Sequence, residues 1–374
     1  MPFGTEDMMP AYDENGNEIN QALTMKETDK KCPMCGGKMD YDPTTKGLYC
    51  PFCEYKQKIE NDGYAMEQDF EDAEATGNCD WGVETKVVIC KSCGAQTVYD
   101  ALQTSGTCPY CGSNQVMEAQ AQNTLAPNGI CPFEIDKQTA SANFKRWLGK
   151  KLFAPSKAKK SAEADKFTGL YLPYWTFDAD TYTQYTAKYG IDRTYTDSRG
   201  ETHTTTDWYY TSGNYDRFID DELVIATDRH ENRMLRQIEP FYTDRSVQYK
   251  PEYIAGFVSE RYSKGLADSW DTASAQIKQK LKSEIERKVL REHGADHVNI
   301  QSMVTDYSNK QYKYLILPVW LSSFRYNSKI YNFCVNGQTG KVGGRSPVSP
   351  IRVIIAILIF AAVLFLIYKM FGSS

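Results

Sequence analysis

The chain has 374 residues, 41% of them hydrophobic, which is enough for two or three compact units that each bury a core. Its formal net charge of -5 argues against a general nucleic-acid binder, which would carry an excess of Lys and Arg. Residues 1–31 are polar and acidic, so we expect them to be disordered and to provide no export signal. The cysteines should therefore stay in a reducing compartment.

Eight cysteines form four C-x-x-C pairs with a repeated spacing. In each half, the second pair follows the first after gaps of equal length, residues 36–49 and 94–107. In a reducing compartment such pairs converge on one tetrahedral metal ion, about 2.3 Å from each sulfur. The pattern predicts two zinc ribbons, residues 32–56 and 86–114, each with one structural Zn ion. The predicted ligands are Cys32, Cys35, Cys50, Cys53, Cys90, Cys93, Cys108 and Cys111.

Four thiolates close the coordination sphere of the metal, so it has no position at which to bind and activate water. Its binding free energy instead folds a unit that is too small to have a core. Iron in a rubredoxin-like site is the alternative, because it also uses two C-x-x-C pairs, but two closely repeated short ribbons favour zinc. Cys79, Cys131 and Cys334 lack the spacing and are expected to be ordinary small apolar residues.

An acidic linker, residues 57–85, separates the predicted ribbons. After the second ribbon, residues 115–166 are expected to form a linker and a basic amphipathic helix over 136–153, with Asp136 as its N-cap. Its apolar residues recur at helical spacing: Phe144, Trp147, Leu148 and Leu152. The favoured interpretation packs this stripe on the next domain, and the alternative lays the helix on anionic lipid.

Residues 167–345 predict a β-rich α+β domain. Aromatic and β-branched residues alternate with polar ones, which is typical of long antiparallel hairpins, and tight turns are expected at 198–200 and 212–214. A surface helix over 271–293 should pack on this sheet, because its apolar residues step by four along one face. These residues are Ala273, Ile277, Leu281, Ile285 and Val289. The similar segments 170–175 and 315–320 suggest a duplicated sheet motif.

An apolar stretch, residues 351–371, predicts a transmembrane helix, since it would rise roughly 31 Å, close to the hydrocarbon thickness of a bilayer. So near the end of the chain it would be a tail anchor. Lys341, Arg345 and Arg352 lie before its apolar core and Lys369 after it, which predicts a single-pass protein of the cell membrane with its N-terminal part in the cytoplasm. The expected fold class is thus multi-domain α+β: two small four-cysteine zinc ribbons, a mainly antiparallel β domain with packed helices, and one C-terminal transmembrane helix.

No catalytic motif accompanies these elements. Residues 337–341 look like part of a phosphate loop, but the positions that need Gly and Ser or Thr hold Val335 and Val342, so a hairpin turn is the better interpretation. His293 and His297 are four residues apart, yet Gly294 interrupts any helix that would pair them as metal ligands. We therefore predict no catalytic residues, no cofactor besides zinc, and no enzyme activity.

With these residues laid out, most of the chain resembles the bacterial tail-anchored TFIIB-type zinc-ribbon membrane proteins. The resemblance rests on the paired ribbons ending in Cys108-Pro-Tyr-Cys111-Gly112, on Pro132-Phe133 before a basic helix with Trp147 and Phe153-Ala-Pro155, on Tyr171-Leu-Pro-Tyr-Trp175, and on 335–342. Relatives encoded beside phage-shock-protein-A-like and flotillin-like (SPFH) proteins imply a membrane platform that recruits such partners in envelope stress. Only the eight cysteines carry over, as zinc ligands.

Three functions of different classes follow. The leading one is a membrane-anchored adaptor that recruits protein partners at the cytoplasmic face of the bilayer. The alternative is a membrane-tethered zinc-ribbon protein that binds nucleic acid through Lys and Arg on the ribbons, against which the acidic linker argues. An enzyme site within residues 167–345 stays open as a third class, because catalytic residues need not form linear motifs.

Overall fold

The computed structural model describes residues 31–60, 63–71, 73, 126–155, 167–227, 232–326 and 329–371. Side chains are described in these ranges except at 324–326, 329–330, 366–367 and 370–371. The backbone alone is described for five further strands: β1 (Ala11–Tyr12), β2 (Glu18–Ile19), β7 (Thr85–Cys90), β8 (Gln96–Asp100) and β9 (Val116–Ala119). Most of the predicted N-terminal segment, of the acidic linker beyond residue 73 and of the second ribbon lies outside the described residues.

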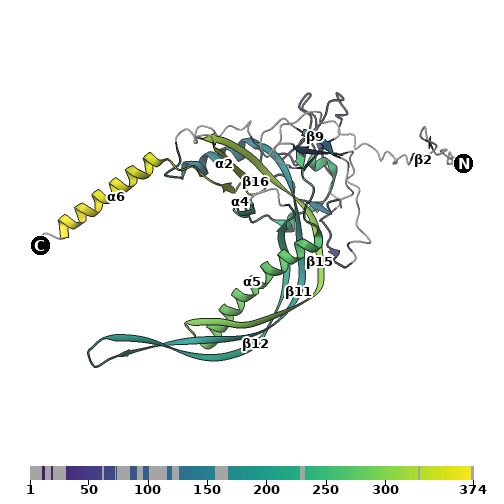
Figure 1. Ribbon diagram of the computed structural model, residues 1–374. Helices are drawn as coiled ribbons and strands as arrows, with labels where there is room; N and C mark the ends of the chain where they lie inside the picture. The colour runs from purple at the N-terminus through teal and green to yellow at the C-terminus, as the bar shows by residue number, and fades with distance from the viewer. Residues whose placement is uncertain are drawn as a thin grey trace.

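Three long antiparallel strands organise the fold (Figure 1). β11 (Thr168–Thr196) lies between β12 (Thr202–Ile225) and β15 (His297–Tyr326). The two similar segments noted in the sequence are direct neighbours, since Leu172 pairs with Leu317. The other strands of this sheet are β6 (Gln68–Asp69), β10 (Gly129–Ile130), β13 (Val247–Gln248), β14 (Val258–Ser259), β16 (Lys329–Asn336), β17 (Val342–Gly344), and, beyond β14, the strands β8, β7 and β9.

The long strands cross two regions, which we call the body and the arm. In the body, residues 169–179 of β11 are buried without interruption, because other segments cover both faces of the sheet. In the arm, residues 180–218 of β11 and β12 and 297–308 of β15, exposed and buried residues alternate over the first part of β11. The alternation arises because one helix, α5 (Leu266–His293), covers one face only. Figure 1 shows the arm extending from the body with α5 along it.

The apolar stripe predicted for the surface helix is confirmed in α5. All five of its residues, Ala273, Ile277, Leu281, Ile285 and Val289, are fully buried. The helix begins at Leu266, earlier than expected, and ends at His293. Gly294 follows in the left-handed region (φ 57°), where a residue without Cβ closes a helix at low cost.

One of the two predicted turns is wrong. The β11–β12 hairpin turns between Asp197 and Glu201, where the Asp197 N–H donates to the Glu201 carbonyl, but residues 212–214 lie inside β12. Gly213 is opposite Tyr185, whose hydroxyl would lie 2.8 Å from a Cβ at this position. The glycine thus makes room for an aromatic ring within a strand. Residue composition alone does not distinguish such a glycine from one in a turn.

Irregular pairing marks the point where the body becomes the arm, which we call the elbow. The register shifts near Asp178 on both sides of β11, and Asp221 and Asn309 adopt positive φ of 49°. Lys313 is buried here, with its Nζ 2.7 Å from Asp221 Oδ1 and 3.2 Å from Glu67 Oε1. Burial raises the pKa of Asp178 to about 7. The Asp221 N–H donates to this carboxyl and lowers its pKa, but burial together with the nearby Glu67 and Asp221 carboxylates has the larger effect.

The predicted amphipathic helix is α2 (Lys137–Gly149), with the Asp136 carboxylate accepting from the Thr139 N–H at its N-terminus. Phe144 and Leu148 are fully buried, and the Phe144 ring stacks on Phe333 of β16 at a centroid distance of 3.6 Å. This packing agrees with the favoured interpretation of the stripe. Leu152, 79% exposed, lies beyond the end of the helix. The remaining short elements of the body are α4 (Asn232–Arg236) and the 3-10 turns Thr243–Arg245 and Pro251–Ile254.

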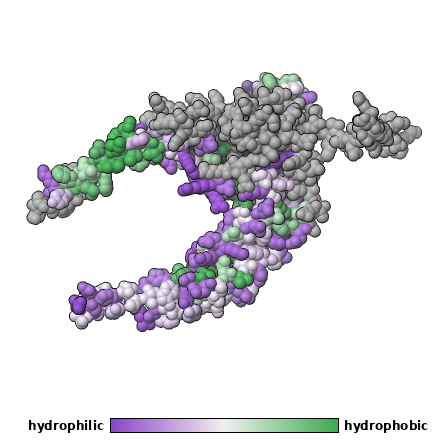
Figure 2. All heavy atoms as spheres, viewed as in Figure 1, coloured by the Kyte–Doolittle hydropathy of each residue, from purple (hydrophilic) through white to green (hydrophobic). Residues whose placement is uncertain are grey.

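The predicted membrane helix is the part of the expected fold class that is wrong. Residues Pro350–Phe371 form α6, and apolar side chains are exposed along it (Figure 2). Among the residues that the structure describes, however, no helix has both the length and the apolar character needed to cross a bilayer. The prediction of a transmembrane helix over 351–371 is therefore withdrawn. The tail-anchored, single-pass cell-membrane assignment and the bilayer as a partner are withdrawn with it.

Candidate metal centre

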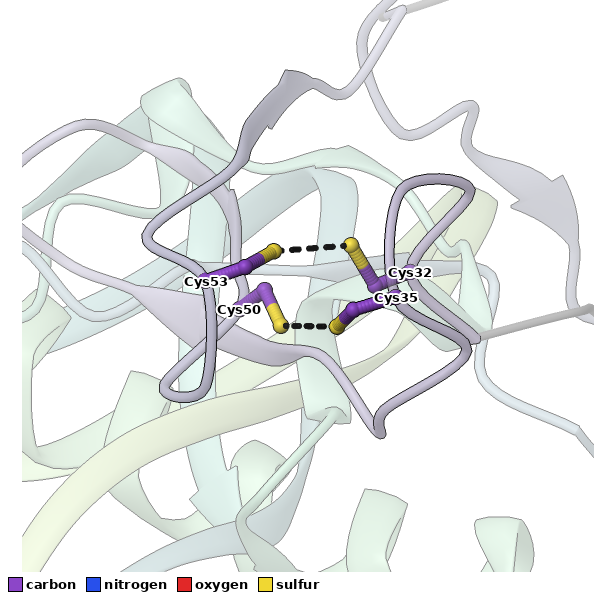
Figure 3. A group of neighbouring side chains, drawn as sticks. All are labelled: Cys32, Cys35, Cys50 and Cys53. Carbon is purple, nitrogen blue, oxygen red and sulfur yellow. Dashed lines mark hydrogen bonds between the residues drawn. The ribbon is translucent and has the colours of Figure 1, made fainter.

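The first two C-x-x-C pairs come together in space. The Sγ atoms of Cys32, Cys35, Cys50 and Cys53 all lie within 4.8 Å of one another (Figure 3). The Sγ distance is 3.4 Å from Cys32 to Cys53 and 3.5 Å from Cys35 to Cys50. Sulfurs of a disulfide are about 2.05 Å apart, whereas those around a tetrahedral ion with bonds of about 2.3 Å are separated by about 3.8 Å. The cluster therefore has the spacing of a four-thiolate metal site.

Two similar turns position these thiols. Cys32 and Cys50 each begin a turn in which their carbonyls accept from the N–H of Gly36 and Glu54, residues with φ of 72° and 62°. Such turns direct backbone amides toward the sulfurs, as the spacing predicts. A three-stranded sheet, β3 (Asp40–Asp42), β4 (Gly47–Tyr49) and β5 (Lys56–Lys58), supports them.

The environment of the thiols favours the ionised form at one position. Burial opposes ionisation of Cys50, but the amides of Cys53 and Phe52 and the neighbouring thiols lower its pKa to about 7. The pKa of Cys53 is raised to about 12: the Tyr55 amide lowers it, but hydrogen bonds to the other thiols and burial outweigh that effect. Four thiolates cannot share this space without a cation, so the donor set fits a divalent metal ion that neutralises part of their charge.

A tyrosine joins the ribbon to the body. Tyr41 of β3 is only 4% exposed, its hydroxyl donates to the Phe133 carbonyl at 3.3 Å, and its N–H donates to the Ala255 carbonyl. Its ring lies against Tyr253 and Phe257 at centroid distances of 5.7 and 6.3 Å. Nothing in the cysteine spacing indicates this contact; the alternation of Met39, Tyr41 and charged neighbours was the available signal. The ribbon thus shares the core of the body.

Two large apolar side chains of the ribbon are exposed. Met34 and Phe52, which occupy the third position of the two C-x-x-C pairs, are 73% and 74% exposed. The Phe52 ring lies over Gly37, where a Cβ would come within 2.5 Å of it, so this glycine lets the ring lie flat on the turn. We call Met34 and Phe52 the ribbon tip.

The second predicted site is described only in part. Cys90 is the last residue of β7, which pairs with β8 and β9. Cys93, Cys108 and Cys111 lie outside the described residues, so the second site stays a prediction. Cys131 and Cys334 are buried free thiols away from the cluster, as expected of ordinary small residues.

The other candidates from the sequence are not brought together. The His293 ring stacks on Tyr189 at 4.0 Å, whereas His297 Nε2 lies 3.0 Å from Asp192 Oδ2, so each has a separate partner. Residues 337–341 form the turn between β16 and β17, as expected, with Gly340 at φ 73°. At the tip of the arm, Asp197, Glu201 and His203 are within reach of one ion, but His203 Nε2 already lies 3.1 Å from Asp197.

The comparisons with known proteins assign no family. No family model matches the chain, and no solved structure matches it. The chain is similar to the uncharacterized protein YdjG of Bacillus subtilis strain 168, with 28% identity over 328 residues that cover 85% of this chain and 90% of that protein. The similarity therefore extends over nearly the whole of both chains.

Proposed function

We propose that this protein is a zinc-ribbon adaptor: it binds another protein through the ribbon tip and has no enzymatic activity. In this proposal Cys32, Cys35, Cys50 and Cys53 hold one structural zinc ion, and the four cysteines of the second ribbon hold another. The bound metal would cross-link the two turns and would have no open coordination position.

The observation that carries the proposal is the exposure of Met34 and Phe52 on a rigid support. Met34 and Phe52, 73% and 74% exposed, lie on two turns that the four clustered cysteines bring together, and methionine and aromatic residues are typical of protein-binding surfaces. Tyr41 fixes the ribbon to the body, so little conformational entropy would be lost on binding. Phage-shock-protein-A-like or flotillin-like proteins are the partners that the sequence resemblance implies.

Capture of a partner from cell extract tests the adaptor proposal. Full-length protein with Met34→Ser and Phe52→Ser should retain its metal but lose at least about tenfold in captured partner, because truncating a hot-spot residue of an interface costs about 2 kcal/mol or more. The matched control is Met66→Ser, a methionine 77% exposed outside the ribbon, which should capture as much as the unchanged chain. Equal capture by the double variant would contradict the assignment of the tip.

A further inference from the structure

The free edge of β12 is the feature that the adaptor proposal leaves unused. Among the described residues, β12 pairs only with β11, so its other edge has no strand beside it. The Asp197 N–H donates to the Glu201 carbonyl, which shows which residue pairs of the β11–β12 ladder are hydrogen-bonded. The register then runs without a shift from Thr196 opposite Thr202 to Ala179 opposite Ile219, so hydrogen-bonded and non-bonded pairs alternate regularly. Odd-numbered residues of β12 in this stretch therefore bond to β11, and even-numbered ones direct their N–H and C=O groups to the free edge.

A contact from α5 supports this alternation and limits the open stretch. Lys288 Nζ donates to the carbonyl of Asn214, an even-numbered residue, at 3.0 Å. From Thr202 to Asn214 the strand contains no Lys, Arg or Pro and no bulge, the devices by which natural sheet edges resist pairing. Its one carboxylate, Asp207, is paired with Arg193 at 2.8 Å. This segment is rich in Thr, Trp and Tyr, residues that favour a paired strand.

Two large aromatic side chains of the same segment are exposed on the face of the sheet that α5 does not cover. Trp208 and Tyr210 are 49% and 77% exposed on the face of the sheet opposite α5. Trp208 is at the middle of the open stretch 202–214. Antiparallel pairing of two copies about Trp208 sets Trp208 against Trp208, Tyr210 against Thr206 and Ser212 against Thr204, and it keeps both α5 helices on one face because only residues of equal parity meet.

The positions of the charged residues in this segment are compatible with pairing between two identical strands. In this register Asp207 meets Tyr209 of the second copy and His203 meets Gly213, so no two like charges are opposite each other. An isologous contact of this kind is complete with two copies and closes the exposed edge of both. We propose that a second copy of this chain pairs with residues 202–214 of β12, antiparallel and centred on Trp208, to form a dimer with a continuous sheet through both arms. This inference is independent of the proposed adaptor function.

Sedimentation equilibrium of the full-length, metal-loaded chain tests the dimer. The unchanged protein should approach twice the chain mass of 42.5 kDa as concentration rises. Thr204→Pro removes an edge-facing N–H without breaking a bond to β11, and Trp208→Lys sets a cation of each copy directly opposite the other at the two-fold axis. Each variant should raise the dimer dissociation constant at least tenfold with unchanged circular dichroism. Phe218→Lys, on the same face but outside the segment, should dimerise normally.

A photo-cross-linking residue at position 204 gives a second, independent measurement. We expect cross-links to residues near Ser212 of the second copy. A monomer at all concentrations, a Phe218→Lys variant that dissociates like Trp208→Lys, or unchanged dimerisation of both Thr204→Pro and Trp208→Lys would overturn the proposal. Cross-links to another protein, with none to residues 202–214, would assign the edge to a different partner and would also overturn it.

Discussion

Replacing Cys50 by serine is expected to release the metal from the first ribbon and to unfold residues 32–58. Cys50 is fully buried and its Sγ is one of four that converge. The ribbon has only a few buried apolar residues, so the metal supplies most of its folding free energy; structural zinc in small units contributes about 10–16 kcal/mol. Zinc content should fall by one ion per chain, and proteases should cleave the ribbon while the arm stays resistant.

The matched control for this substitution is Cys334→Ser. Cys334 is also fully buried and free, but it lies in β16 away from the cluster, so its variant should keep the full metal content. Unfolding of the first ribbon should also remove the Tyr41 ring from its contacts with Tyr253 and Phe257 of the body. A Cys50→Ser protein that keeps its metal and its protease resistance would contradict the four-thiolate site.

Replacing Lys313 by methionine is expected to destabilise the elbow by about 3–5 kcal/mol at pH 8, because it leaves Asp221 and Glu67 without their buried cation. Burial raises the pKa of the neighbouring Asp178 to about 7, so the stability of the unchanged protein should itself fall as pH rises through 7, and the loss caused by the substitution is read against it at each pH. Chemical denaturation of both proteins from pH 5 to pH 8 measures the difference.

Lys282→Met is the control for Lys313→Met. Lys282 and Glu286 form an exposed pair at 3.9 Å on α5, and such pairs contribute about 0.5 kcal/mol or less. Its effect should be small at every pH in moderate salt. An equally small effect of Lys313→Met at every pH would show that the elbow does not depend on its buried cation.

Local patterns in the sequence predicted those features that depend on local geometry. The C-x-x-C spacing anticipated the convergence of Cys32, Cys35, Cys50 and Cys53, and the four-residue step anticipated the buried stripe of α5. Both depend on short-range periodicity, which the backbone repeats. The Gly213 turn was wrong because the same residue type serves a turn or a close aromatic contact.

Features that depend on distant partners were not predictable in this way. The docking of Tyr41 joins β3 to segments more than ninety positions away in the chain, and the elbow brings together Glu67, Asp221 and Lys313 from three distant parts of the chain. Short-range periodicity in the sequence does not indicate which distant residues come into contact. The predicted span at 351–371 rested on the length and apolar composition of one stretch, and it is contradicted by the absence of a membrane-spanning helix among the described residues.

The metal content of the purified full-length protein, measured together with X-ray absorption at the metal edge, tests the account most directly. The account predicts two zinc ions per chain, each bound by four sulfurs at about 2.3 Å with no oxygen or nitrogen ligand. Iron in place of zinc, a mixed ligand set, or a folded protein without metal whose four clustered thiols react freely would contradict it.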